Sequence, residues 1–106
     1  MTRGEEFRAA VRGGARGAQP ALVAHVVLGT GGPTRVGFVV SKAIGTATDR
    51  NRVKRRLRHL MRDRVDLLPG GSRVVVRALP SSSSQSSASL GDQLDAALRR
   101  CGATRA

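Results

Sequence analysis

Aromatic side chains and cysteine are nearly missing from this sequence of 106 residues. Phe7 and Phe38 are its two aromatic residues, and it has no Trp or Tyr. Proteins that bind single-stranded RNA by base stacking intersperse several aromatic rings among their basic residues, so the composition speaks against that class. The single cysteine, Cys101, cannot form an internal disulfide. This excludes the small disulfide-stabilised scaffolds and predicts a reducing, cytoplasmic location.

Long apolar segments are missing as well. The longest, residues 21–28, is interrupted by His25 and is much shorter than the roughly 20 residues that a membrane-spanning helix needs. The first seven residues, MTRGEEF, lack the apolar core of a signal peptide. We therefore expect no membrane partner, and one domain over residues 1–106 with a core of its own.

Acidic residues are scarce, with 7 Asp or Glu against 19 Lys or Arg, which leaves a net charge of +12. The excess is concentrated. Between Arg50 and Arg64 lie eight basic residues and one acid, Asp63, so this short segment alone carries +7. Such a concentration of charge predicts a polyanionic partner, most commonly a nucleic acid, that contacts one element of the fold.

The basic segment has the spacing of an amphipathic helix. Its apolar residues fall at i, i+4, i+7 and i+8: Val53, Leu57, Leu60 and Met61. Thr46 or Thr48, together with Asp49, can cap its start. At about 100° per residue, four residues point directly away from the apolar face, namely Asn51, Arg55, Arg58 and Arg62, and Arg52, Lys54 and Arg56 flank them. Like charges at these spacings repel, which favours contact with phosphates over a purely solvated face.

The remaining segments predict an α+β fold. The spacing of Phe7, Ala10 and Val11 indicates a short first helix, and strands are expected at residues 15–19, 22–28, 35–41 and 72–78. The glycine-rich segment 29–33 is followed by a strand, so we interpret it as a hairpin turn and not as a phosphate-binding loop.

The C-terminal part predicts a connector and a last helix. Residues 80–89 contain seven serines, and we expect a flexible connector there. A helix is expected to follow, with Ser89 and Asp92 capping its N-terminus and Gly102 ending it. Its apolar residues are Leu90, Leu94, Ala97, Leu98 and Cys101.

No combination of residues suits catalysis by side chains. His25, His59 and Cys101 lack the spacing of zinc ligands. Ser41 and Lys42 are adjacent on a strand and would point to opposite faces, so they do not form a nucleophile and its base. We predict no catalytic side chain, no metal bound by the protein alone and no small-molecule substrate.

Two motifs carry a family resemblance. The first is Arg35-Val-Gly-Phe-Val-Val-Ser-Lys42, followed by Ile44-Gly45, and the second is Arg50-Asn-Arg-Val-Lys-Arg-Arg-Leu-Arg58. Together they closely resemble the protein subunit of bacterial ribonuclease P, and a weaker match extends from Glu6-Phe7 to the last helix. The resemblance implies a two-layer sandwich of α-β-β-β-α-β-α order, with an unusual left-handed crossover at the basic helix.

The resemblance also implies a function. The protein would assist a catalytic ribonuclease P RNA in the endonucleolytic removal of the 5′ leader from precursor tRNA, while the RNA holds the catalytic Mg²⁺ ions. Positions of the basic motif would contact this RNA: Arg50, Asn51, Arg52, Lys54, Arg55 and Arg58. We add Arg62 from the outward stripe. Phe7, Lys42 and Arg77 match a leader-binding cleft between the first helix and the sheet.

Three departures from the family pattern affect these expectations. Members usually carry a longer basic segment before the Phe, whereas six residues precede Phe7 in this sequence. Val11 stands where a second aromatic residue is common, which would weaken stacking on the leader. Asp49 precedes the basic motif where an apolar residue is usual, and its charge would favour the helix N-terminus while slightly opposing RNA. Two alternatives stay open: a ribosomal or other structural rRNA-binding protein, and a basic helix at anionic membranes, which would need larger apolar anchors than this helix offers.

Overall fold

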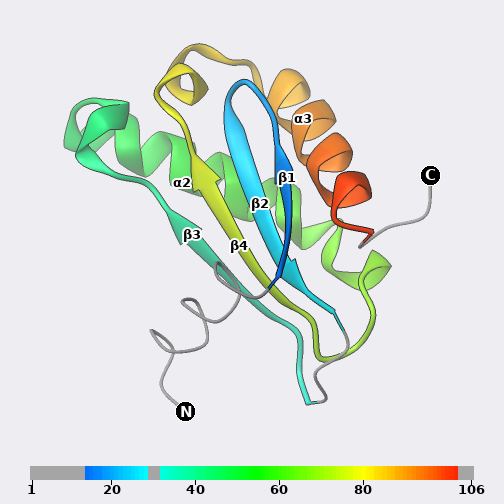
Figure 1. The fold of residues 1–106 in the computed structure, drawn as a ribbon. Helices are drawn as coiled ribbons and strands as arrows, with labels where there is room; N and C mark the ends of the chain where they lie inside the picture. Colours follow the sequence, from blue (N-terminus) through cyan, green and yellow to red (C-terminus); the bar gives the residue numbers. More distant parts are fainter. Residues whose placement is uncertain (1–13, 29–31, 103–106) are drawn as a thin grey trace.

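The computed structural model describes residues 14–28 and 32–102. These residues form one sheet with helices on one side of it (Figure 1). In chain order the elements are β1 (Ala15–Ala18), β2 (Leu22–Val27), β3 (Arg35–Val39), the short 3₁₀ helix η1 (Lys42–Ile44), α2 (Ala47–Arg62), η2 (Val65–Leu67), β4 (Arg73–Ala78), η3 (Pro80–Ser84) and α3 (Ser87–Arg100). The four expected strands and the last two expected helices are confirmed. The helix expected around Phe7 lies outside the described residues.

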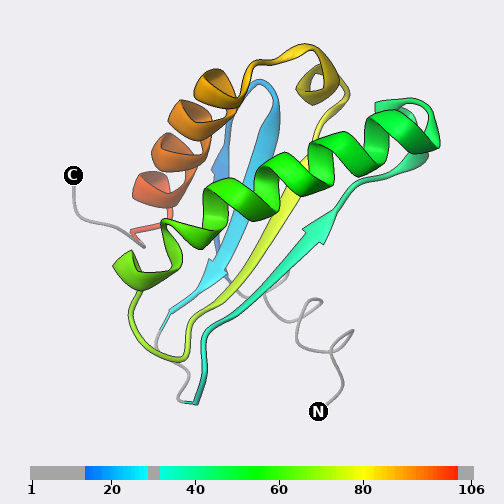
Figure 2. The ribbon, with the colours of Figure 1, turned by 180° about the vertical axis from the view of Figure 1, so that it is seen from behind.

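The strand order in the sheet is β1-β2-β4-β3. β2 pairs antiparallel with β1 and β4, whereas β3 pairs parallel with β4. The chain leaves β3, passes through α2 and returns as β4. Seen from the helix side, with the strands pointing upward, this path runs from β3 to its left-hand neighbour β4 (Figure 2). The crossover is therefore left-handed, as the family resemblance implied, and opposite to the usual hand.

The link between β2 and β3 is not a hairpin, and this expectation was wrong. β4 lies between the two strands and pairs with both, so β2 and β3 are not neighbours in the sheet. The glycine-rich composition correctly indicated a change of direction. It could not indicate which strand fills the position beside β2, because that strand begins only at Arg73, 46 positions after β2 ends at Val27.

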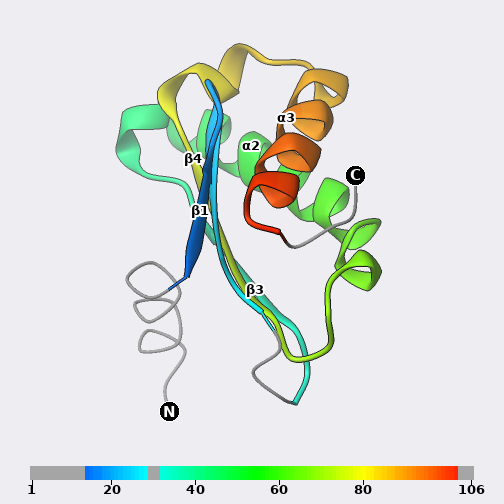
Figure 3. The same cartoon turned by 45° about the vertical axis from the view of Figure 1, so that its right-hand side comes forward.

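The core lies between the sheet and the two helices, which cover the same face (Figure 3). Strand residues that alternate toward this face are buried, among them Leu22, Val26 and Val76. The helices contribute the predicted apolar positions to the same core: Val53, Leu57, Met61, Leu90, Leu94, Ala97, Leu98 and Cys101. None of the helices in the described part of the chain is long and apolar enough to cross a membrane.

α3 packs closely against the outer strand β1, and a glycine makes this possible. A Cβ atom at Gly17 would lie 2.2 Å from the carbonyl oxygen of Ala97, so only a residue without a side chain fits there. Cys101 follows α3, and its Sγ lies 3.5 Å from the carbonyl oxygens of Ala15 and Ala24. Burial raises the pKa of this thiol, which suits a core residue and not a nucleophile.

The serine-rich segment is structured, so the expectation of a flexible connector over residues 80–89 was wrong. Pro80 begins η3, Ser82 is fully buried, and α3 already begins at Ser87. The cap of α3 is Ser86, whose side chain accepts a hydrogen bond from the Ser89 amide at 3.0 Å, and not Ser89 as expected. A run of serines offers several equivalent caps, and tertiary packing selects among them.

Candidate nucleic-acid interface

The basic helix α2 begins with a reciprocal cap. The Thr46 side chain accepts a hydrogen bond from the Asp49 amide at 3.2 Å, and the Thr46 amide donates to the Asp49 carboxylate at 3.1 Å. Gly45 precedes the cap with φ of 145°, and a Cβ atom there would lie 2.6 Å from Asp49 Oδ2. Gly45 and Asp49 are therefore required by the same turn, which fixes where the helix starts.

This cap accounts for Asp49, the acid that departs from the family pattern. Hydrogen bonds from the backbone and side chain of Thr46, and the nearby charge of Arg52, lower the pKa of Asp49. The carboxylate is thus ionised at neutral pH beside the positive end of the helix dipole. Its role in the free protein is to start α2.

The outward face of α2 is exposed as predicted. Asn51, Arg55, Arg58 and Arg62 are all exposed, while Val53, Leu57 and Met61 are buried against the sheet. An open groove of about 490 Å³ runs along this face, and we call it the helix groove. It is lined by Thr48, Asn51, Arg52, Lys54, Arg55 and Arg58. No acidic side chain from the described residues lines it, so the groove presents hydrogen-bond donors and positive charge to anything that enters.

Two arginines beside the helix groove also hold the serine-rich segment. Arg52 donates to the Asp49 carboxylate at 3.2 Å and to the Ser83 carbonyl at 3.4 Å, and Arg56 donates to the Gln85 carbonyl at 3.0 Å. These bonds connect α2 to η3 and to the turn before α3. The side chain of Arg52 stays 40% exposed, so it can still contribute charge to the groove.

Two more predicted RNA-binding residues lie at the ends of the helix groove. Arg50 faces the end of β3, where it lines a small groove of about 290 Å³ with Val40 and Lys54. Arg62 is on the last turn of α2 and lines a further groove together with Val65. The predicted RNA-binding residues are therefore distributed along the whole of α2, and they do not all line the same groove.

Arg64, the last basic residue of the segment, is used inside the protein. Its guanidinium binds the Asp95 carboxylate of α3 at 2.6 and 3.2 Å and donates to the Leu60 carbonyl at 2.8 Å. This bidentate ion pair joins the end of α2 to the middle of α3. Part of the positive charge counted from the sequence is thus neutralised within the fold.

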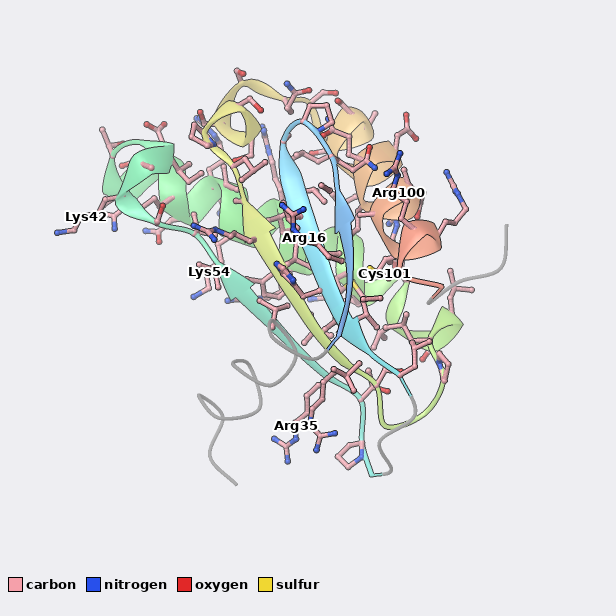
Figure 4. All side chains as sticks on the ribbon, viewed as in Figure 1. Arg16, Arg35, Lys42, Lys54, Arg100 and Cys101 are labelled. Carbon is pink, nitrogen blue, oxygen red and sulfur yellow. The ribbon has the colours of Figure 1, made fainter. Side chains whose placement is uncertain are left out.

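The sheet has a second basic surface on its other face. Arg77 alternates away from the helices and lies beside Val39 of β3. Lys42 follows the same end of β3 and is exposed in η1 (Figure 4). Because β3 and β4 are parallel, the structure brings these two predicted leader-binding residues to one end of the sheet. The third, Phe7, lies outside the described residues.

Sequence reasoning missed two residues of this second surface, Arg16 and His25. They are register partners on β1 and β2, and His25 is 8% exposed with no hydrogen-bond partner for its Nδ1 in the described part of the chain. Burial, followed by the charges of Arg16 and Arg77, lowers the pKa of His25, so the ring is neutral at pH 7. Alternation along β2 and β4 could have predicted that His25 and Arg77 share a face, but the pairing of β1 could not be derived from spacing.

Together the fold and the surfaces define a class: a small α+β protein with one long basic helix and a basic sheet face behind it, a combination typical of nucleic-acid-binding proteins. A family model described as Ribonuclease P matches residues 1–102. Ribonuclease P protein components are similar in sequence. That of Streptomyces avermitilis is 55% identical over 94% of this chain and 89% of its own length, and that of Nocardioides sp. is 50% identical over 94% and 88%.

Solved structures agree in fold. The ribonuclease P protein of Staphylococcus aureus superposes with a TM-score of 0.85 at 19% identity, covering 99% of this chain and 96% of its own. That of Thermotoga maritima has a TM-score of 0.79 at 23% identity, covering 94% of each chain. The chain belongs to the ribonuclease P protein family. It is the protein component of a tRNA-processing endoribonuclease and works with an RNA partner.

Proposed function

We propose that α2 binds the catalytic ribonuclease P RNA through the helix groove and thereby supports removal of the 5′ leader from precursor tRNA. The observation that carries this proposal is the groove itself, which has cationic and amide side chains and, among residues 14–28 and 32–102, no acid along its lining. Arginine forks bind phosphate oxygens in pairs, and each phosphate neutralised releases counterions. A folded RNA that presents phosphates along one side matches a straight basic helix better than a single strand does.

The second basic surface is proposed to hold the leader. Arg77 lies on the face of the sheet away from the helix groove, and Lys42 lies in η1 at the same end of the sheet. Such an arrangement lets the protein contact its RNA partner and the precursor tRNA at the same time. We place this work in the cytoplasm, where precursor tRNA is made in bacteria.

The catalytic Mg²⁺ ions are proposed to be bound by the RNA. Among residues 14–28 and 32–102, no group of three or more His, Cys, Asp or Glu side chains is placed to hold a metal ion. No step of the reaction is therefore assigned to a protein-bound metal. The contribution of this chain is to neutralise phosphates that would otherwise repel one another, and so to lower the Mg²⁺ concentration that the RNA needs.

A reconstitution tests this function. The protein, a transcribed bacterial ribonuclease P RNA and a precursor tRNA are mixed at low Mg²⁺, and release of the leader is measured. We expect clear stimulation over the RNA alone. Absence of stimulation, together with tight binding to ribosomal RNA, would instead indicate a structural rRNA-binding protein.

Paired charge-removal variants test the role of α2 in the same assay. Arg55→Ala with Arg58→Ala should lower affinity for the RNA and reduce the log–log salt dependence by about one to two. Arg99→Ala with Arg100→Ala is the matched control, because it removes the same charge from the end of α3, away from the groove. Equal effects of the two pairs would show that net charge, and not the helix groove, determines binding.

A further inference from the structure

A second groove, of about 310 Å³, lies between the outer strand β3 and the C-terminal half of α2. We call it the edge groove. α2 crosses the sheet obliquely, approaches β3 near η1 and then passes over the neighbouring strands (Figure 2). Because β3 is the last strand of the sheet, no further strand in the described part of the chain closes this side. The groove is lined by Val36, Phe38, Arg58, Met61, Arg62 and Val65.

The lining of the edge groove combines two chemistries. Its floor is apolar and includes the half-buried ring of Phe38, and its polar side chains are Arg58 and Arg62. A phosphate alone would use the arginines but not the floor, and an apolar peptide would use the floor but leave two cations without a partner. A nucleotide uses both, since its base is flat and largely apolar on its faces while its phosphates are anionic.

The edge groove is continuous with the helix groove, because Arg58 lines both. A strand whose phosphates follow Arg55 and Arg58 toward Arg62 passes the mouth of the edge groove. We propose that one unstacked base of the RNA partner inserts there, against Phe38. This inference rests on the proposed function, and it refines it: the protein binds phosphates along α2 and a single base at the edge of the sheet. One ring is enough for one base, so the scarcity of aromatic residues is no obstacle.

Titration of a transcribed bacterial ribonuclease P RNA over a range of salt concentrations tests the proposal. Phe38→Ala should weaken binding about tenfold, the usual effect of losing one stacked base. Its log–log salt slope should equal that of the wild type, because a base contact releases no counterions. Arg58→Ala should instead reduce the slope by about one. Leu67→Ala, which shortens an exposed apolar side chain outside both grooves, should bind like the wild type.

A second variant separates base binding from packing, since Phe38 also packs against the core. Phe38→Leu keeps an apolar side chain at the site and removes the ring, and thermal unfolding monitors the fold of both variants. Base-specific chemical probing of the RNA should reveal an unpaired base that the wild type protects and that becomes reactive with Phe38→Leu. The backbone protections along α2 should remain.

The outcomes are distinct. Wild-type affinity and unchanged base protection with Phe38→Leu would overturn this inference while leaving the proposed function intact, and failure of the wild type to bind the RNA would overturn both. A reduced salt slope with the Phe38 variants would mean that Phe38 only positions the arginines. A dimer of the free protein that Phe38→Leu dissociates, with RNA binding unchanged, would identify the groove as a protein interface. Each of these two results would also overturn the proposal.

Discussion

At the scale of single residues, the start of α2 shows how a local motif serves an electrostatic purpose. Gly45 allows the turn, Thr46 caps the helix, and Asp49 completes the cap while its charge faces the positive end of the helix dipole. A helix with so many like charges gains little from its own side-chain pairs. A strong cap is therefore valuable, even though it places an acid next to an RNA-binding surface.

The cap predicts a specific pH dependence. The pKa of Asp49 is lowered in the folded protein, so its contribution to stability is present above the unfolded pKa of about 3.9 and is lost as the pH falls through the lower folded value. Asp49→Ala should lower the unfolding temperature at pH 7, and its difference from the wild type should narrow below about pH 4. Thermal unfolding followed by circular dichroism at several pH values measures this. A constant difference down to pH 2 would contradict the role given to the carboxylate.

At the scale of elements, α2 has a different neighbour on each side. Val53, Leu57 and Met61 pack on the sheet, Arg52 and Arg56 hold the serine-rich turn, and the outward stripe is exposed. At its C-terminal end the helix is joined to α3 by the pair of Arg64 and Asp95. The position of the proposed RNA-binding stripe therefore depends on contacts that neighbouring arginines make within the protein.

The contribution of the ion pair between Arg64 and Asp95 to the stability of the protein can be measured. Arg64→Ala removes the bidentate ion pair with Asp95 and a hydrogen bond to the Leu60 carbonyl. Because the ion pair is only partly buried, the loss should lower the unfolding free energy by about 1 kcal/mol. For a chain of this size that corresponds to a decrease of roughly 4–8 °C in the unfolding temperature.

Arg62→Ala provides the comparison for stability. It removes the same charge from an exposed position two residues earlier, and the unfolding free energy should change by less than about 0.5 kcal/mol. Denaturant titration of both variants distinguishes them. Equal losses of unfolding free energy in the two variants would show that the total charge of α2, and not the ion pair with Asp95, determines stability.

At the scale of the whole molecule, positive charge is divided between two surfaces. The helix groove lies on the outer side of α2, and the basic face with Arg16 and Arg77 lies on the other side of the sheet. Arg100 is separate from both, on the last turn of α3 (Figure 4). This division fits the proposed function, in which one small chain contacts two RNA molecules at once.

The two surfaces should be separable by mutation. Arg77→Ala should weaken binding of precursor tRNA to the assembled enzyme by about 1 kcal/mol, roughly fivefold, as expected for one lost charge-assisted contact. Binding of mature tRNA, which has no leader, should not change, and neither should assembly with the ribonuclease P RNA. Arg100→Ala serves as the control with the same charge change. An equal loss with precursor and mature tRNA would place Arg77 outside the leader-binding surface.

The sequence by itself determined the four strands, the two long helices and the direction of the proposed RNA-binding stripe. These follow from periodicity, since apolar residues of α2 such as Val53 and Leu57 recur with the helical repeat and thereby define the opposite face. The family motif from Arg50 to Arg58 added the nature of the partner. These inferences are local and involve residues within a few turns of one another.

Other features were decided only by the tertiary structure, because they depend on residues distant in the chain. β4 separates β2 from β3, the carbonyls of Ser83 and Gln85 accept bonds from arginines about 30 residues earlier, and Arg64 is neutralised by Asp95. The edge groove is likewise a product of packing, since it joins β3 to the end of α2. The scarcity of aromatic residues predicted recognition of RNA through phosphates, and the structure places one of its two phenylalanines where a single base can reach it.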